Sequence, residues 1–468
     1  MSRTPSASRL LVALVLALAV LPTARAQAPV GDWNGALAIP GAPAPLAFSI
    51  RITATGDSLA STIDIPQQGA LGLPATTTTF RNDSLVVTYA VFGGRLDLAV
   101  APDSLRGTFS QGPGTLPVTL GPGAIVLARP QTPAAPFPYT EEAVTVEAAP
   151  GVTLAGTFVR PAGAGPFPAV LLLSGSGAQD RDESLFGHRP FAVLADHLAR
   201  QGIASLRLDD RGEGASTGDY ATATLPDLAA DARAALAVLR ARPGVAQAGI
   251  VGHSLGGLVA PRVAGADFVV MLAAPSVRGS DLFALQNERI ARASGIDSTA
   301  AAAYGAAIAT TMQPLLDAPA APDSVLQAPM EAALNTGLMA VPTAARTRLG
   351  LAGGGYAERR RQTVAGMLSP ELRGILLSDP ASALAALRVP ALAVYGGLDT
   401  QVPADQNAPP MRAALAARPG SEVVVLAGKN HLFQSAETGS PGEYGQIEET
   451  MSPEALTAVS AWILRTAR

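Results

Sequence analysis

Gly249-Ile250-Val251-Gly252-His253-Ser254-Leu255-Gly256 joins a short apolar run to a helical pattern that continues to Ala264. Within it, Ser254 stands between Gly252 and Gly256 in the pattern Gly-x-Ser-x-Gly. A strand, a sharp turn and a helix in this order are typical of a nucleophile elbow, which exposes its serine at the carboxyl edge of a sheet. Glycine on both sides removes side chains that would collide across the turn. The stretch therefore predicts a serine nucleophile on a sheet of α/β type.

A serine becomes a good nucleophile when a neighbouring base removes its proton, and histidine usually supplies that base. The chain has only four histidines, at positions 188, 197, 253 and 431. His253 is the covalent neighbour of Ser254 and is expected to point away from it. His188 and His197 lie upstream, and His197 falls within a helical pattern. His431, which follows the apolar run 423–426, is therefore the expected base.

The base is normally oriented by a carboxylate. Asp399 ends the segment Tyr395-Gly396-Gly397-Leu398-Asp399, just past an apolar run, and is the expected acid. Asp405, six residues further on in a helical pattern, is the alternative. The order Ser254, Asp399, His431 differs from that of the chymotrypsin and subtilisin types and matches the α/β-hydrolase order.

Backbone amides are expected to stabilise the oxyanion that forms when a nucleophile attacks a carbonyl. One donor should be the amide of Leu255, the residue after the nucleophile. The other should come from the loop Ser174-Gly175-Ser176-Gly177, which follows the apolar run 169–173, and Ser176 is the expected donor. This loop lacks the lysine and the spacing of a phosphate-binding P-loop.

From about residue 142, short apolar runs alternate with amphipathic helical stretches. The runs are 169–173, 203–208, 249–251, 268–273, 389–395 and 423–426. This alternation predicts a mostly parallel sheet with helices on both faces. An alanine-rich helical stretch at about 277–385 interrupts the alternation, and we expect it to form an inserted helical cap rather than a solvated spacer.

Residues 27–128 show a different pattern, which predicts a small all-β domain of hairpins. Apolar residues alternate with smaller or polar ones, and the tripeptide Asp-Ser-Leu recurs at 57–59, 83–85 and 103–105. Each copy has the composition of a turn that enters a strand. The proline-rich stretch 129–141 predicts a semi-rigid linker to the α/β domain at 142–468.

Residues 1–26 have the arrangement of a secretory signal peptide. Arg3 and Arg9 precede the apolar run 10–21, and Ala24-Arg25-Ala26 follows it. The run is shorter than the roughly 20 residues that span a bilayer. We therefore expect a bacterial protein that is exported to the periplasm or the medium, without stable membrane insertion after cleavage.

The composition of the 468 residues limits the classes of function. Hydrophobic residues make up 48% of the chain, which excludes a wholly disordered protein. A net charge of −4 without a basic run argues against nucleic acid as a partner. The chain has no cysteine, and therefore no disulfide or thiolate metal site. We expect no metal and no cofactor, and the oligomeric state is open.

Together these segments resemble the α/β-hydrolase superfamily and, within it, the EstD-like carboxylesterases. The resemblance covers about 142–468 and is carried by the elbow and by the segments 174–183, 209–216, 398–403 and 430–434. It implies hydrolysis of a small-molecule ester. Two positions depart from the family: Ser174 stands where histidine is common and Ala178 where proline is common, and both concern the oxyanion loop.

These features predict an exported serine esterase that acts through an acyl-enzyme. One alternative is a serine aminopeptidase-like peptidase, because the same three side chains serve such enzymes. The other is a non-catalytic binding protein on the same fold.

Overall fold

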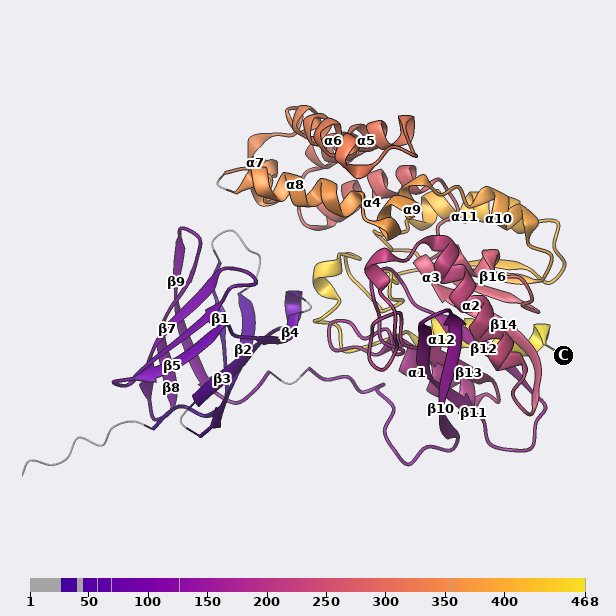
Figure 1. The fold of residues 1–468 in the computed structure, drawn as a ribbon, viewed down its shortest axis with the longest axis horizontal. Coiled ribbons are helices and arrows are strands. Elements are labelled where there is room, and N and C mark those ends of the chain that lie inside the picture. The colour runs from indigo at the N-terminus through magenta and orange to yellow at the C-terminus, as the bar shows by residue number, and fades with distance from the viewer. Residues whose placement is uncertain are drawn as a thin grey trace, which may run out of the picture. The chain divides into compact units, whose positions relative to one another are not determined.

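The computed structural model describes residues 27–39, 45–56, 58–68, 70–125, 127–353 and 355–467. The expected signal peptide, residues 1–26, lies outside them. The chain divides into two compact units (Figure 1). The first comprises the chain up to Asp64 together with Gly72–Ile125, and the second comprises Ile65–Leu71 together with Val126–Arg468.

The first unit carries an antiparallel sheet of nine strands in the order β4-β3-β2-β1-β9-β8-β7-β6-β5. The strands are β1 (Gly31–Leu37), β2 (Leu46–Thr55), β3 (Ser58–Ile65), β4 (Ala70–Pro74), β5 (Thr77–Arg81), β6 (Ser84–Tyr89), β7 (Gly94–Ala101), β8 (Ser104–Gln111) and β9 (Gly114–Pro122). The expected all-β domain is thus confirmed. The Asp-Ser-Leu copies behave alike, because Ser58, Ser84 and Ser104 each begin a strand.

The two ends of this sheet approach each other. β4 and β5 stand at opposite ends of the strand order, yet only Ala75 and Thr76 lie between them in the chain. The amide of Ala75 donates to the carbonyl of Ser61 on β3 at 2.8 Å. The hydroxyls of Ser61 and Thr78 also lie 2.8 Å apart and join β3 to β5. The sheet is therefore curled into a half-barrel, and Trp33 is buried in it.

The second unit is built on an eight-stranded sheet in the order β10-β11-β13-β12-β14-β15-β16-β17. The strands are β10 (Thr140–Ala149), β11 (Val152–Arg160), β12 (Phe167–Leu173), β13 (Ala204–Leu208), β14 (Val245–His253), β15 (Val269–Leu272), β16 (Ala391–Gly396) and β17 (Glu422–Leu426). β11 pairs antiparallel with β10 and with β13, and every later pair is parallel. This strand order confirms the expected α/β-hydrolase fold.

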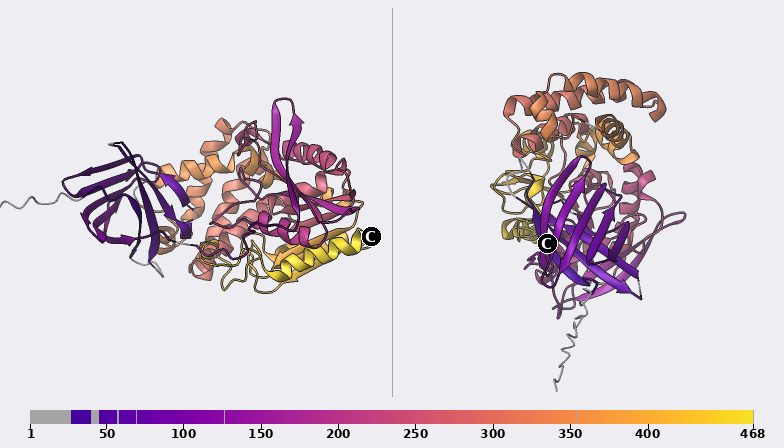
Figure 2. Two further views of the ribbon diagram at one scale, coloured as in Figure 1. Left: turned by 90° about the horizontal axis from the view of Figure 1, so that it is seen from below. Right: turned by 90° about the vertical axis from the view of Figure 1, so that its left-hand side faces the viewer.

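Helices cover both faces of this sheet, which explains why β12, β15 and β16 consist almost entirely of apolar residues. One apolar layer includes α2 (Leu225–Arg240), α3 (Leu255–Val259) and α11 (Ala404–Leu415). The opposite layer includes α1 (Pro190–Arg200) and α12 (Pro453–Thr466). In the left view of Figure 2, α12 is the yellow helix that ends at the C-terminus.

The expected cap is present between β15 and β16, as the group of orange helices in Figure 1. Its helices are α4 (Gly279–Ala293), α5 (Ser298–Asp317), α6 (Asp323–Leu338), α7 (Thr343–Arg348), α8 (Tyr356–Met367), α9 (Pro370–Leu377) and α10 (Ala381–Ala386). They enclose an apolar cluster of their own. The cap therefore has its own packed interior, and it is not a solvated spacer.

The start of the proline-rich segment is fastened to the second unit. The guanidinium of Arg129 donates to the carbonyl groups of Ile447 at 3.1 Å and of Phe186 and Gly445 at 2.8 Å. The side-chain amide of Gln131 bonds to backbone groups of residues 450 and 451. Residues 129–131 thus belong with the hydrolase unit rather than forming a free linker.

Candidate active site

Ser254 sits on a sharp turn between β14, which ends at His253, and α3, which begins at Leu255. Its backbone has φ 52° and ψ −111°, a conformation that costs a residue with a side chain about 1–3 kcal/mol. A Cβ atom on Gly252 would overlap the carbonyl oxygen of Gly256. The expected elbow geometry is therefore present, and glycine is needed for the close approach across it.

Asp399 and His431 come from the ends of neighbouring strands. Asp399 follows β16, His431 follows β17, and His431 Nδ1 lies 2.8 Å from Asp399 Oδ2. The other carboxylate oxygen, Asp399 Oδ1, accepts the amides of Gln401 and Val402 at 2.8 and 2.9 Å. These bonds fix the carboxylate and aim it at the imidazole. Both side chains are buried.

The alternative acid, Asp405, is placed differently. Its carboxylate pairs with Arg289 at 2.6 Å, and its side chain is 64% exposed. Among the described contacts it has none with His431. Of the two acids that the sequence offered, Asp399 is the one that the fold brings to the imidazole.

His431 lies beside the elbow. Its ring centroid is 4.8 Å from that of His253, the residue before Ser254. His253 Nε2 donates to the carbonyl of His431 at 3.0 Å. His253 itself is directed to Glu183 and to this carbonyl, which agrees with the expectation that it points away from the nucleophile.

The loop 174–177 packs against the start of α3. The amide of Gly256 donates to the carbonyl of Ser174 at 2.9 Å. A Cβ atom on Gly175 would lie 3.6 Å from the Cβ atom of Ser254, so the loop passes directly beside the serine. Leu255 is the first residue of α3, and the amide of a first helical residue has no acceptor within its helix.

Two amides of this loop are occupied and the one between them is not. Gly175 donates to Glu183 Oε1 at 2.6 Å, and Gly177 donates to Glu371 Oε1 at 2.9 Å. Across the part of the chain that the structure describes, the Ser176 amide has no acceptor. The two amides expected to stabilise an oxyanion, those of Leu255 and Ser176, are therefore both available for a ligand.

Glu183, His253 and Glu371 are site residues that the sequence did not identify as such. In the sequence, Glu183 belongs to the charged run 180–183, at the end of the segment 174–183 that carries the family resemblance. A signal was available, since the four charged residues 180–183 are separated from the glycine-rich loop by only two residues. Glu371 lies on α9 of the cap, and no pattern marks it because its contact depends on how the cap folds.

The other charged residues of this loop form ion pairs. Asp182 pairs with Arg189 and Arg207, and Arg181 pairs with Asp209. Within the described ranges, no group of three or more histidine, aspartate, glutamate or cysteine residues could hold a metal ion. These ion pairs join residues 181 and 182 to the start of α1 and to the end of β13.

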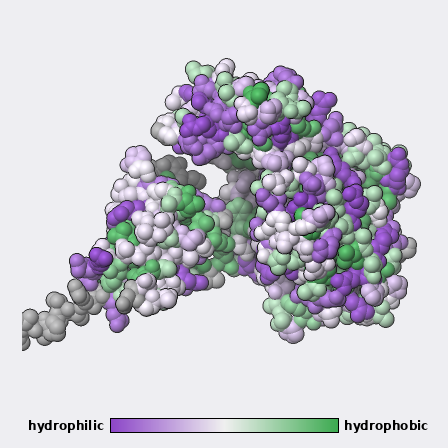
Figure 3. Space-filling view, viewed as in Figure 1, coloured by the Kyte–Doolittle hydropathy of each residue, from purple (hydrophilic) through white to green (hydrophobic). Residues whose placement is uncertain are grey.

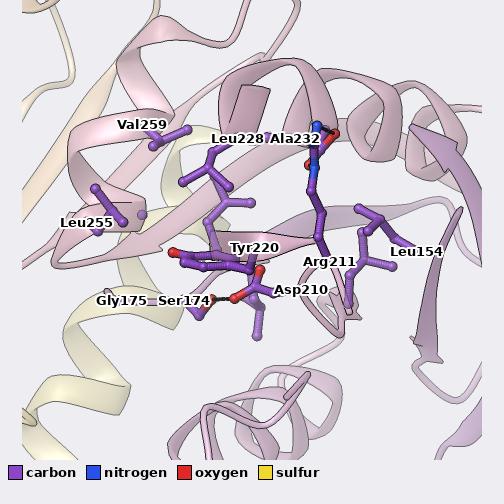
Figure 4. A pocket seen from close by; sticks show the side chains of 15 residues that line it. Leu154, Ser174, Gly175, Asp210, Arg211, Tyr220, Leu228, Ala232, Leu255 and Val259 are labelled. Carbon is purple, nitrogen blue, oxygen red and sulfur yellow. Dashed lines mark hydrogen bonds and ion pairs between the residues drawn. The ribbon is translucent and has the colours of Figure 1, made fainter. Parts of the chain in front are cut away.

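A cavity of about 60 Å³ lies beside the oxyanion loop (Figure 4). Leu228, Leu255 and Val259 form an apolar side, while Tyr220 and Asp210 lie next to Ser174. Burial raises the pKa of Asp210 to about 7. Ser174 stands at the position where histidine is common in similar sequences. Its Oγ donates to Asp210 Oδ2 at 3.3 Å, so this side chain is held by a carboxyl group.

On the face seen in Figure 3, hydrophilic and hydrophobic residues are interspersed over the cap and the hydrolase core. Two large exposed apolar residues of the cap lie at opposite ends of α6, Val325 near its start and Met339 directly after its last residue. None of the helices among the described residues is long and apolar enough to cross a membrane.

Comparisons with known proteins support a hydrolase. A family model described as "Serine aminopeptidase, S33" matches residues 188–296. Esterase EstD of Thermotoga maritima is 27% identical over 344 residues, which are 70% of this chain and 69% of that protein. The expected resemblance to EstD-like esterases is thus confirmed.

Several solved structures are similar at low sequence identity. An esterase of Pyrococcus furiosus is 15% identical, with a TM-score of 0.40 over 74% of this chain and 100% of that one. Est1E of Butyrivibrio proteoclasticus is 15% identical, with a TM-score of 0.38 over 69% and 98% of the two chains. A proline iminopeptidase of Mycobacterium smegmatis is 14% identical, with a TM-score of 0.41 over 70% and 99%.

Proposed function

Starting from an α/β-hydrolase fold and a sequence similar to that of an esterase, we propose that this protein hydrolyses carboxylic esters through a covalent acyl-serine. Ser254 is the nucleophile, His431 the base and Asp399 the carboxylate that orients it. The observation that carries the proposal is the 2.8 Å bond between His431 and Asp399, formed beside a strained turn that bears Ser254.

In the first half of the reaction, Ser254 Oγ attacks the ester carbonyl carbon while His431 Nε2 takes its proton. The carbonyl oxygen becomes an oxyanion and accepts hydrogen bonds from the amides of Leu255 and Ser176. Collapse of this intermediate breaks the bond to the alkoxy oxygen, which takes the proton from His431 and leaves as the alcohol. Asp399 stabilises the imidazolium and fixes its tautomer.

In the second half, His431 removes a proton from water, and the resulting hydroxide attacks the acyl carbon. Collapse returns the proton to Ser254 Oγ and releases the carboxylic acid. Both halves use only side chains and amides of this chain and one water molecule.

A fluorophosphonate probe tests this assignment, because it reacts with activated serines. We expect one label on the wild-type protein, located by peptide mass spectrometry at Ser254, and none on Ser254→Ala. Hydrolysis of p-nitrophenyl acetate should disappear in the same variant. A wild-type protein that neither labels nor hydrolyses any ester of a p-nitrophenyl series would support the non-catalytic alternative instead.

A peptidase is the second candidate, and it is favoured by the match of residues 188–296 to a family model described as a serine aminopeptidase. The same serine would then attack an amide carbonyl. Aminoacyl p-nitroanilides, assayed beside the p-nitrophenyl esters, separate the two candidates. If kcat/KM is higher on the anilides than on the esters, the proposed substrate becomes a peptide.

Export is part of the proposal and rests on the sequence of residues 1–26. The protein, expressed in a bacterium with its own N-terminus, should be recovered from the periplasm or the medium with Gln27 as its first residue. N-terminal mass spectrometry decides this, and an intact N-terminus in the cytoplasm would contradict it.

A further inference from the structure

A second buried carboxylate–histidine pair lies beside that of Asp399 and His431. Glu183 Oε1 is 2.8 Å from His253 Nδ1, and the two residues are only 3% and 6% exposed. The proposed reaction assigns neither of them a step. Taking two charges out of water is costly, so a buried pair that has no step in the reaction indicates another role.

The pair joins the three segments on which the proposed reaction depends. Glu183 Oε1 accepts the amide of Gly175 at 2.6 Å and so holds the oxyanion loop. His253 Nε2 donates to the carbonyl of His431 at 3.0 Å and so holds the loop that carries the base. His253 is also bonded covalently to Ser254 at the elbow. Donor, nucleophile and base are therefore linked through two adjacent side chains.

This linkage requires a charged histidine. Both partners of the His253 ring are acceptors, a carboxylate at Nδ1 and a carbonyl at Nε2. A neutral imidazole has one N–H group and can donate to only one of them, whereas the imidazolium donates to both. Burial lowers the pKa of His253, but the charge and hydrogen bond of Glu183 and the carbonyl of His431 outweigh it and raise the pKa overall.

The backbone at Glu183 indicates that its position is imposed by these contacts. Its φ is 53°, in the left-handed region that a residue with a side chain seldom adopts. The amide of Glu183 donates to the carbonyl of Asp180 at 3.0 Å, which closes a tight turn. This turn directs the carboxylate back to Gly175 and His253.

We propose that Glu183 and His253 are positioning residues. They hold the Ser176 amide and the His431 side chain in the places that the reaction at Ser254 requires. The inference rests on the proposed function. It assigns Glu183 no contact with the substrate. It predicts that loss of this carboxylate slows the chemical steps more than it weakens substrate binding.

Asp182 supplies a matched control. It is the preceding residue, is equally buried and lies in the same loop, but it pairs with Arg189 and Arg207, away from the elbow. Asp182→Asn should therefore lower thermal stability while leaving kcat within about twofold of wild type.

The experiment measures kcat and KM for p-nitrophenyl acetate, the rate of fluorophosphonate labelling and the melting temperature. Loss of an oxyanion donor typically costs 10²–10³ in kcat. We expect Glu183→Leu to lower kcat by about 10²-fold, with KM within about threefold of wild type. Glu183→Gln keeps an oxygen for Gly175 but removes the charge that His253 needs, and it should lower kcat by about tenfold. Labelling at Ser254 should slow in parallel.

Two results would overturn the inference. One is a Glu183→Gln variant with kcat within twofold of wild type, and this result decides the matter even if Glu183→Leu does not fold. The other is an Asp182→Asn variant that loses as much kcat as Glu183→Gln at the same melting temperature. A wild-type protein that neither labels nor turns over esters would instead contradict the proposed function.

Discussion

Glu371 Oε1 accepts a hydrogen bond from the backbone amide of Gly177 at 2.9 Å, although the first belongs to the cap and the second to the oxyanion loop. The same oxygen accepts the hydroxyl of Tyr220 at 3.0 Å. A carboxylate of the cap therefore helps to shape the loop that is proposed to stabilise the oxyanion. The cap thus contacts this loop directly, through a side chain of α9.

Replacing Glu371 should slow ester hydrolysis. Glu371→Ala frees Gly177 and loosens the loop, and we expect kcat to fall about tenfold, a barrier change of about 1.4 kcal/mol. Glu358→Ala is the matched control, because Glu358 is an exposed carboxylate of the cap that pairs with Arg361. Steady-state kinetics on p-nitrophenyl acetate compares the two. Equal activities would mean that the loop keeps its shape without the cap.

The strain at Ser254 predicts a gain in stability when activity is removed. Glycine adopts positive φ without a steric penalty, although its freedom in the unfolded chain costs about 0.5–1 kcal/mol. We expect Ser254→Gly to be inactive and more stable to urea than Ser254→Ala by up to about 1 kcal/mol. If alanine is the more stable of the two, the turn is less strained than its φ of 52° indicates.

Exchanging each candidate acid for its amide separates their roles. Asp399→Asn should lower kcat by up to about 10⁴, because the amide favours the wrong imidazole tautomer. Asp405→Asn breaks only an exposed pair with Arg289 and should leave kcat unchanged. Pre-steady-state acylation measured by stopped flow would locate the loss in the chemical step. A larger loss from Asp405→Asn would reassign the acid.

His188 predicts that stability falls in mild acid. Burial, with the nearby charge of Arg129, lowers the pKa of His188 to about 4. In the unfolded chain the group binds a proton below about pH 6.5, whereas the folded protein resists protonation until about pH 4. The unfolded state thus binds more protons in this window, and stability is lost as the pH falls from 6.5 to 4.

The loss should be on the order of 1–2 kcal/mol after allowance for solvent screening. Urea unfolding at pH 7 and pH 5 measures it, with His188→Gln as the comparison. The variant should show a smaller difference between the two pH values, and an unchanged difference would exclude His188 as the source.

The hydrolase unit should fold and act without the half-barrel. A chain that begins at Leu127 retains every proposed active-site residue and lacks only residues 65–71 and 126 of its unit. We expect a cooperative thermal unfolding transition and a kcat on a small ester within about tenfold of wild type. An insoluble or molten product would show that the half-barrel completes the hydrolase core.

A chain that begins at Tyr139 should be less stable, because it loses the hydrogen bonds of Arg129 and Gln131, worth about 1 kcal/mol each. Circular dichroism during heating compares the two chains. Identical melting temperatures would mean that these bonds contribute nothing to the folded unit.

The sheet, the cap and the positions of Ser254, Asp399 and His431 at strand ends could be predicted from local patterns. Apolar runs mark the strands, and glycines mark the turns that leave a side chain at the carboxyl edge. These signals depend only on residues close together in the chain, so one sequence is enough to recognise them. The sequence favours Asp399 over Asp405, but both follow the same strand, and the contact with the imidazole is seen only in the fold.

The supporting contacts could not be predicted, because they join residues far apart in the chain. Glu371 is 194 positions from Gly177, and Glu183 is 70 from His253. Each is one carboxylate among 37 acidic residues, and no local pattern indicates the distant group to which it bonds. Arg129 likewise lies in a segment whose prolines indicate a linker, while its bonds to residues 445 and 447 depend on how the C-terminal loops fold.

The joined ends of the first sheet have a consequence for how the protein behaves at high concentration. Open strand edges are templates on which other chains add strands, and this is a common route to aggregation. In the half-barrel, Ser61 and Thr78 bring β3 and β5 together, so this seam is already occupied by the chain itself. If the protein is exported as proposed, it folds after crossing a membrane, and a first domain whose ends contact each other would then be less open to added strands. Ser61→Pro, which breaks that seam, should turn a monodisperse protein into one that self-associates.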